Sequence, residues 1–199
     1  MVSAEQIFAN ANLEIAGSVP WGKAVPLDRP GVYAVATTED ITATGSPQDA
    51  KISGEAVRAL LTARPELTVD RIVASVDELA VRLAALWVFN EPVLYIGMST
   101  KPLRKRVGQY VRHRLGASGP HKGGWPLKVL APLDEYWVHF AASDDPGTAE
   151  RLMLDTFAVG LPASTIAALH DPDHPMPFAN LEYPKGTRKR HGIKGASPT

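Results

Sequence analysis

The sequence predicts a mixed α/β (α+β) fold, in which a few short strands are combined with helices of ordinary length. Three runs have the apolar or alternating pattern of strands: residues 32–38 (VYAVATT), 93–97 (VLYIG) and 135–141 (EYWVHFA). Between and after these runs, apolar residues recur at helical spacing behind residues that commonly begin helices. A chain of 199 residues is expected to form one domain, with room for an insertion.

The first half of the chain contains one of the strands and several helix signals. The N-terminal segment 1–15 is expected to be a short polar helix, and Pro30 with Gly31 marks the turn before the first strand. Two helices should follow, because Ser53 is placed to cap one and Ser75 begins a capping-box spacing for the other.

The second half has a different order of elements. A basic helix is expected from about residue 102 to 115, and a loop rich in glycine and proline leads to the third strand. A helix should then begin at Asp145 and end near Gly160. A proline-rich loop precedes the closing segment FANLEYP, at 178–184.

Composition excludes several classes of protein. The hydrophobic content of 45% is ordinary, and no apolar run approaches the roughly 18 residues of a membrane span. The N-terminus lacks the basic start and apolar stretch of a signal peptide, so a cytoplasmic protein without membrane contact is expected. Because there is no cysteine, any metal would be held by oxygen or imidazole ligands.

The net charge of zero conceals an asymmetry. Residues 1–100 carry seven Lys and Arg against twelve Asp and Glu, a net of −5, whereas residues 101–199 carry fourteen against nine, a net of +5. The positive charge is concentrated in residues 101–114 and 185–194. Such clusters suit phosphate contacts, although a solvated helix surface with a basic tail explains them equally well.

The basic helix carries an arginine in an unusual place. Leu103, Arg106, Val107 and Tyr110 fall at i, i+3, i+4 and i+7 and therefore share one helix face. A guanidinium on an apolar face needs an anionic partner to offset its desolvation. The neighbouring charges point elsewhere, as solvated or phosphate-steering groups.

A carboxylate in the following helix presents the same problem. Glu150 shares a stripe with Met153, Leu154 and Phe157, where a charge is costly unless it is paired or bound to a metal. Two interpretations stay open: an ion pair with Arg106, or a single carboxylate binding a hard cation that keeps most of its waters.

Several short motifs follow one another in a definite order. They are GVY at 31–33, YIG at 95–97, Leu103-x-x-Arg106 with Tyr110, Ala149-Glu150, and a late Phe178-Ala179-Asn180. This ordered set resembles the GIY-YIG nucleases. The resemblance implies a small three-stranded antiparallel sheet flanked by helices, a single divalent ion (Mg²⁺ or Mn²⁺), and hydrolysis of phosphodiester bonds.

The resemblance also implies roles for particular residues. Glu150 would hold the metal, Tyr33 would activate or orient the attacking water, and Arg106 would stabilise charge on the phosphate. Tyr95 would hold this network in place, and Asn180 would organise the site from behind. The implied catalytic residues are Tyr33, Tyr95, Arg106, Tyr110, Glu150 and Asn180.

The expected partner is nucleic acid, with DNA favoured, and the expected enzyme is an endonuclease. Residues 39–91 form a helical insertion relative to the family pattern, and residues 185–199 are expected to be a basic, flexible tail. Met98 stands where many relatives carry lysine. The residues expected to contact nucleic acid are Gly97, Arg104, Lys105, Arg112, Lys122, Arg188 and Arg190.

Two rival functions remain open at this point. The chain could be a nucleic-acid-binding module that keeps the fold without cleavage. It could also be a protein-interaction module, in which Glu150 and Arg106 form only a buried ion pair.

Overall fold

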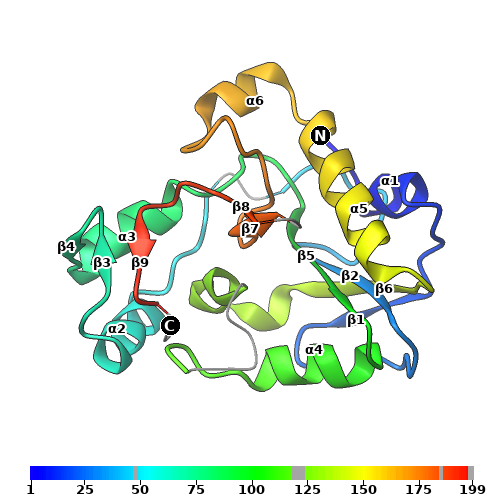
Figure 1. Ribbon diagram of the computed structural model, residues 1–199, viewed down its shortest axis with the longest axis horizontal. Coiled ribbons are helices and arrows are strands. Elements are labelled where there is room, and N and C mark those ends of the chain that lie inside the picture. The colour runs from blue at the N-terminus through cyan, green and yellow to red at the C-terminus, as the bar shows by residue number, and fades with distance from the viewer. Residues whose placement is uncertain (47–48, 118–123, 184–185, 197–199) are drawn as a thin grey trace.

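The computed structural model describes residues 1–46, 49–117, 124–183 and 186–196, and its main feature is an antiparallel sheet with helices on both faces (Figure 1). Four strands form this sheet in the order β1-β6-β2-β5, and each neighbouring pair is antiparallel. Their bounds are β1 Gly17–Pro20, β2 Gly31–Ala36, β5 Val93–Ser99 and β6 Trp137–Ala142.

Strands β2, β5 and β6 are the three that the sequence predicts, and the mixed fold class is confirmed. The expectation of a three-stranded main sheet is corrected to four strands, because β1 pairs with β6 as an additional edge strand. The four residues of β1 include Gly17 and Pro20. Proline cannot donate to a central ladder and is tolerated at a sheet edge, so such a strand has little sequence signal.

Strand β2 lies between β6 and β5, and all six of its residues are buried. At its first residue the chains approach closely: a Cβ added to Gly31 would overlap the carbonyl oxygen of Ala141 on β6. Glycine is therefore required there by the close contact between the two backbones.

Alternating residues of β2 belong to two separate cores. Tyr33 and Val35 pack on one face with helix α4 (Leu103–Arg112), the helices of the insertion and the 3-10 helix η1 (Trp125–Val129). Val32 and Ala34 pack on the other face with α1 (Ala4–Asn10) and α5 (Pro146–Gly160). Helices α4 and α5 thus lie on opposite faces of the same sheet.

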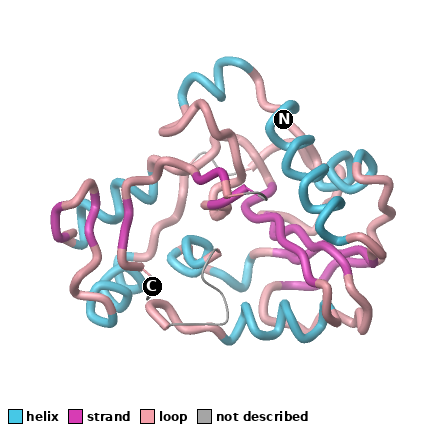
Figure 2. Tube along the Cα trace, in the orientation of Figure 1, coloured by secondary structure: helices cyan, strands magenta, loops and turns pink. Residues whose placement is uncertain are grey.

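The insertion contains both of the helices that the sequence predicts. Helix α2 (Gly54–Ala63) is capped by Ser53, and α3 (Val76–Ala84) begins with a complete capping box from Ser75. A hairpin that the sequence analysis did not predict joins them. Its strands are β3 (Thr68–Val69) and β4 (Ile72–Val73), and Figure 2 shows it at the end of the molecule away from the main sheet.

The C-terminal segment returns to the insertion. Strands β7 (Glu182–Tyr183) and β8 (Thr187–Arg188) pair with each other, and β9 (Ile193–Lys194) pairs with β3. Ile193, Ala196 and Lys189 are buried. In its described part, 186–196, the basic segment is packed against the domain and is not a free tail.

Two short elements complete the order: the 3-10 helix η2 (Leu133–Glu135) and helix α6 (Ala163–Ala168). In the described part of the chain, no helix is both long and apolar enough to cross a bilayer.

The close contact at Gly31 gives a first prediction. Gly31→Ala should lower the free energy of unfolding by about 1–3 kcal/mol, because a methyl group there forces β2 away from the β6 backbone. The matched control is Gly54→Ala, at the exposed start of α2, where an added Cβ meets nothing within 4 Å. Urea unfolding of both variants tests this. Equal stability of the two would contradict the strand packing described here.

Candidate functional site

Three tyrosines from two strands and one helix pack together below the candidate site. Tyr33 on β2 faces Gly97 across the β2–β5 pair, and Tyr95 lies two residues earlier on β5. The ring centroids of Tyr33 and Tyr95 are 5.8 Å apart, and those of Tyr95 and Tyr110 are 5.3 Å apart. The three rings therefore form one aromatic cluster.

Gly97 creates the space that these rings occupy. A Cβ at Gly97 would lie 2.7 Å from a ring carbon of Tyr95 and 2.9 Å from one of Tyr33. The absence of a side chain at Gly97 predicts close approach of a backbone or of a phosphate. Instead, Gly97 is buried, and the two tyrosine rings fill the position that a side chain would take.

The tyrosine hydroxyls are held in their neutral form. Burial, reinforced by the other tyrosines, raises the pKa of Tyr33 and of Tyr110 well above the ordinary value. Burial and the charge of Glu150 raise the pKa of Tyr95 to about 12. A phenolate base at neutral pH is therefore disfavoured, and these hydroxyls are suited to hydrogen bonding instead.

The hydroxyls of Tyr33 and Tyr110 have different surroundings. Tyr110 donates to the carbonyl oxygen of Gly124 and so ties α4 to the start of η1. Within the described residues, the Tyr33 hydroxyl is buried and makes no hydrogen bond of ordinary geometry, although Tyr95 is near enough to perturb its pKa. Such a buried, unsatisfied hydroxyl is unusual and marks this spot as a candidate site.

Arg106 and Glu150 reach this cluster from opposite faces of the sheet. Arg106 belongs to α4 and Glu150 to α5, and both side chains are half-buried. Burial raises the pKa of Glu150 to about 7, while the positive charge of Arg106 acts in the opposite direction. Glu150 also perturbs Tyr95, so the guanidinium, the carboxylate and the tyrosines form one electrostatic unit.

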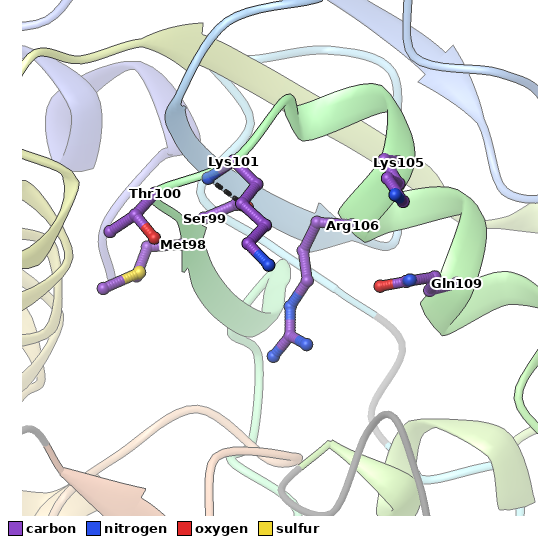
Figure 3. Close-up of a pocket in the computed structure, with 7 residues that line it drawn as sticks. All are labelled: Met98, Ser99, Thr100, Lys101, Lys105, Arg106 and Gln109. Carbon is purple, nitrogen blue, oxygen red and sulfur yellow. Dashed lines mark hydrogen bonds between the residues drawn. The ribbon is translucent and has the colours of Figure 1, made fainter.

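A cavity of about 360 Å³ opens beside Arg106. Its wall is formed by the end of β5 and the first turns of α4, and Figure 3 shows the side chains around the open space. The lining residues are Met98, Ser99, Thr100, Lys101, Lys105, Arg106 and Gln109. Three of these residues are cationic and none is acidic, which is an environment suited to an anion.

Asn180 does not reach into this cavity but fixes the strand beside it. Its carboxamide oxygen accepts from the amide of Ile96 at 2.9 Å, and its carboxamide nitrogen donates to the carbonyl of Ile96 at 2.8 Å. The amide of Ala179 donates to Leu94 at 2.9 Å. Asn180 thus acts as an extra strand partner for β5; its part in a catalytic site stays a prediction.

The loop before Asn180 is held in turn by a buried lysine. The Lys189 ammonium donates to the carbonyl oxygens of Met176, Pro177 and Phe178, at 3.2, 2.8 and 3.4 Å. Burial lowers the pKa of Lys189 to about 7, and Asp171 acts against this change. Three carbonyl acceptors satisfy the three donors of an ammonium. Lys189, which the sequence places in the predicted basic tail, is therefore an internal support.

The other described cations that are expected to contact nucleic acid lie outside the cavity wall. Arg104 pairs with Asp28 at 3.2 Å, Arg188 with Glu182 at 3.7 Å and Arg190 with Asp173 at 2.8 Å. Arg112 lies further along α4, and Lys122 is outside the described residues. Of the members of that set that the structure describes, only Lys105 lines the cavity.

Lys101 and Gln109 line the cavity but are absent from the residues expected to contact nucleic acid. Helical periodicity could have identified Gln109, because it lies three residues after Arg106 on the same face of α4. Lys101 precedes the helix, so periodicity gives no signal for it.

The donor set limits which metal could bind. No group of three or more His, Cys, Asp or Glu side chains in the described part of the chain is arranged to hold a metal. One carboxylate next to hydroxyl oxygens fits a hard divalent ion that keeps several waters, as Mg²⁺ does. It does not fit a structural zinc site.

Comparison with known proteins adds no family assignment. No protein-family model, no curated protein and no solved structure matches the chain. The chemistry of the site therefore rests on the residues described above.

The bond pair of Asn180 gives a second prediction. Asn180→Ala should cost roughly 1–3 kcal/mol for each backbone group of Ile96 left unpaired. Asn180→Asp should also destabilise at neutral pH, because a carboxylate oxygen would then face the carbonyl of Ile96. The control is Asn10→Ala on the exposed side of α1. Chemical denaturation measures all three, and an Asn180→Ala variant as stable as the control would rule out this support of β5.

The raised pKa of Glu150 gives a third prediction. A carboxyl group whose pKa is higher in the folded state contributes stability below its ordinary value of 4.5, and this contribution is lost as the pH rises to about 7. Glu150→Gln should therefore become progressively more stable than the wild type between these two values. Glu91 has a pKa raised in the same way, but it is present in both proteins, so its contribution to the stability difference cancels. The measurement is denaturant unfolding across this pH range. A variant that loses stability relative to wild type as pH rises would indicate a structural ion pair with Arg106.

Proposed function

We propose that this protein is a metal-dependent endonuclease that hydrolyses phosphodiester bonds in nucleic acid, with DNA as the favoured substrate, by chemistry similar to that of the GIY-YIG nucleases. One observation carries the proposal. A half-buried carboxylate, Glu150, is grouped with Arg106 and neutral tyrosines beside a cavity lined by cations. Phosphoryl transfer requires positive charge and a positioned nucleophile more than covalent chemistry from the protein.

Arg106 is placed to bind the reacting phosphate. Its side chain extends into the open space of the cavity (Figure 3), and a guanidinium can contact two phosphate oxygens at once. Charge that accumulates on these oxygens during hydrolysis would be stabilised there. Lys105 adds a second positive charge from the same helix.

The tyrosines would orient water and not remove its proton. Their raised pKa values keep them neutral, and a neutral hydroxyl both donates and accepts a hydrogen bond. The Tyr33 hydroxyl, which lacks an ordinary hydrogen-bond partner among the described residues, is the best placed to take a water when the site opens.

Glu150 is the residue that would hold a divalent cation. Bound there, Mg²⁺ or Mn²⁺ would supply Lewis-acid stabilisation of the scissile phosphate and the leaving oxygen. Binding requires the carboxylate form, so a pKa of about 7 makes cation affinity increase with pH around neutrality.

The burial of Tyr33 favours one alternative. Its hydroxyl is inaccessible in this conformation, and a protein that never opened this spot would bind nucleic acid without cutting it. The cation-lined cavity would serve such a binding module equally well.

Glu150→Gln separates these functions in a fourth prediction. With Mg²⁺, cleavage of plasmid and of short DNA and RNA substrates should fall by about 10²-fold or more, because the charge that holds the cation is lost. Binding measured in chelator should survive. The matched control is Glu135→Gln, an exposed carboxylate paired with Lys51 at 3.8 Å, which should cut at the wild-type rate.

Three outcomes are informative. A folded Glu150→Gln protein that cuts as fast as wild type would remove Glu150 from the mechanism. Binding without cleavage in the wild type, with Mg²⁺ and with Mn²⁺, would support the binding module. Neither binding nor cleavage would leave protein interaction as the surviving alternative.

A further inference from the structure

The cavity beside Arg106 carries more positive charge than one phosphate requires. Lys101, Lys105 and Arg106 all line it, and both lysines are exposed. None of the lining residues is acidic. Like charges grouped around one space repel one another, so the arrangement is unfavourable until an anion enters.

In the described part of the chain, the charge of the two lysines is not offset by an ion pair. Among the described residues, neither ammonium group forms an ion pair, whereas the nearby Arg29 and Arg104 pair with Asp144 and Asp28, each at 3.2 Å. The undescribed residues, 47–48, 118–123, 184–185 and 197–199, include no aspartate or glutamate in the sequence. The lysines are thus available to a ligand.

The positive potential comes from side chains and not from the helix end. The first amides of α4, at Leu103 and Arg104, donate to the carbonyls of Arg29 and Leu27 at 2.9 Å each. They are not available to bind an anion. Lysine ammonium groups act as mobile point charges, which suits the contact of a flexible phosphate group.

Both lysines belong to the cavity wall beside Arg106. Figure 3 shows Lys101 and Arg106 extending side by side into the open space, with Lys105 and Gln109 on the helix to one side. Arg106 is coupled to Glu150, but Glu150 is not part of the cavity wall. A phosphate held between Arg106 and Glu150 would therefore leave the two lysines for a neighbouring group.

We propose that Lys101 and Lys105 form a second phosphate subsite, so that the ligand presents two adjacent phosphates of one nucleic-acid strand. This inference rests on the proposed function, which places the reacting phosphate at Arg106. A strand fits better than a free diphosphate because positive charge continues along α4 to Arg112. The space of about 360 Å³ is also at the small end for ligand pockets, which suits one segment of a longer chain.

The test measures binding of a fluorescent DNA duplex in chelator over a series of salt concentrations. Lys101→Gln and Lys105→Gln should each weaken binding, but the remaining lysine keeps the phosphate contact, so each single variant should change the slope of log affinity against log salt only in part. Because both lysines share one phosphate, the double variant should lose the whole contact and reduce this slope by about 0.9, the value for one phosphate. Lys51→Gln, which removes an exposed lysine paired with Glu135, is the control and should leave the slope unchanged. Melting temperatures confirm that each variant is folded.

A competition arm distinguishes the two sources of paired phosphates. Inorganic pyrophosphate and adenosine diphosphate should displace the duplex only at concentrations at least about 100-fold above that of a competing unlabelled duplex. Displacement at comparable concentrations would overturn the assignment to a strand. A double variant with the same slope as the Lys51 control would overturn the subsite itself.

The outcome is independent of cleavage. Lysine-dependent binding by a protein that does not cut would support the subsite and count against the nuclease proposal. Cleavage by lysine variants whose salt slopes are unchanged would support the nuclease proposal and count against the subsite.

Discussion

The carboxamide of Asn180 both accepts from and donates to the backbone of Ile96, and this pair of hydrogen bonds fixes the outer edge of β5. The other edge of β5 is paired with β2, so the strand cannot shift without breaking bonds on both sides. Its residues then set the site: Tyr95 enters the aromatic cluster, and Met98 begins the cavity wall. The coverage by Asn180 stops at Ile96, and the cavity starts two residues later. One part of this edge of β5 is therefore held by Asn180, and the next part is open to a ligand.

The electrostatics of the site follow from this placement. Because burial keeps the tyrosines neutral, they neither repel a phosphate nor compete with Glu150 for a cation. Glu150 is the carboxylate that couples to both Arg106 and Tyr95. The ionised form of a carboxyl group with a pKa raised to about 7 can be stabilised in two ways, by an ion pair or by a bound metal ion. The proposed chemistry depends on the second.

Local signals in the sequence predict much of this fold. Apolar runs mark β2, β5 and β6, and serine caps mark α2 and α3, because each signal acts within a few residues. Strand β1 and the β3–β4 hairpin are too short to show a pattern. Helical spacing places Arg106 on the packed face of α4, but the support from Lys189 depends on a contact with residues 176–178 that no local rule contains. The sequence marks Gly97 as a place of close approach, but it does not show what approaches. In the structure, the rings of Tyr33 and Tyr95, from two strands, fill the space beside this glycine.

The central claim, that Glu150 holds a divalent cation beside the cavity, can be tested by NMR of the methionine methyl groups with added Mn²⁺. Met98 lines the cavity and its methyl group lies near the start of α5, whereas Met176 packs beside Lys189 in a different part of the fold. A paramagnetic ion at Glu150 should broaden the Met98 signal at Mn²⁺ concentrations that leave Met176 sharp, and Glu150→Gln should abolish this difference. Selective broadening of Met98 that persists in the variant, or no selective broadening in the wild type, would contradict the account.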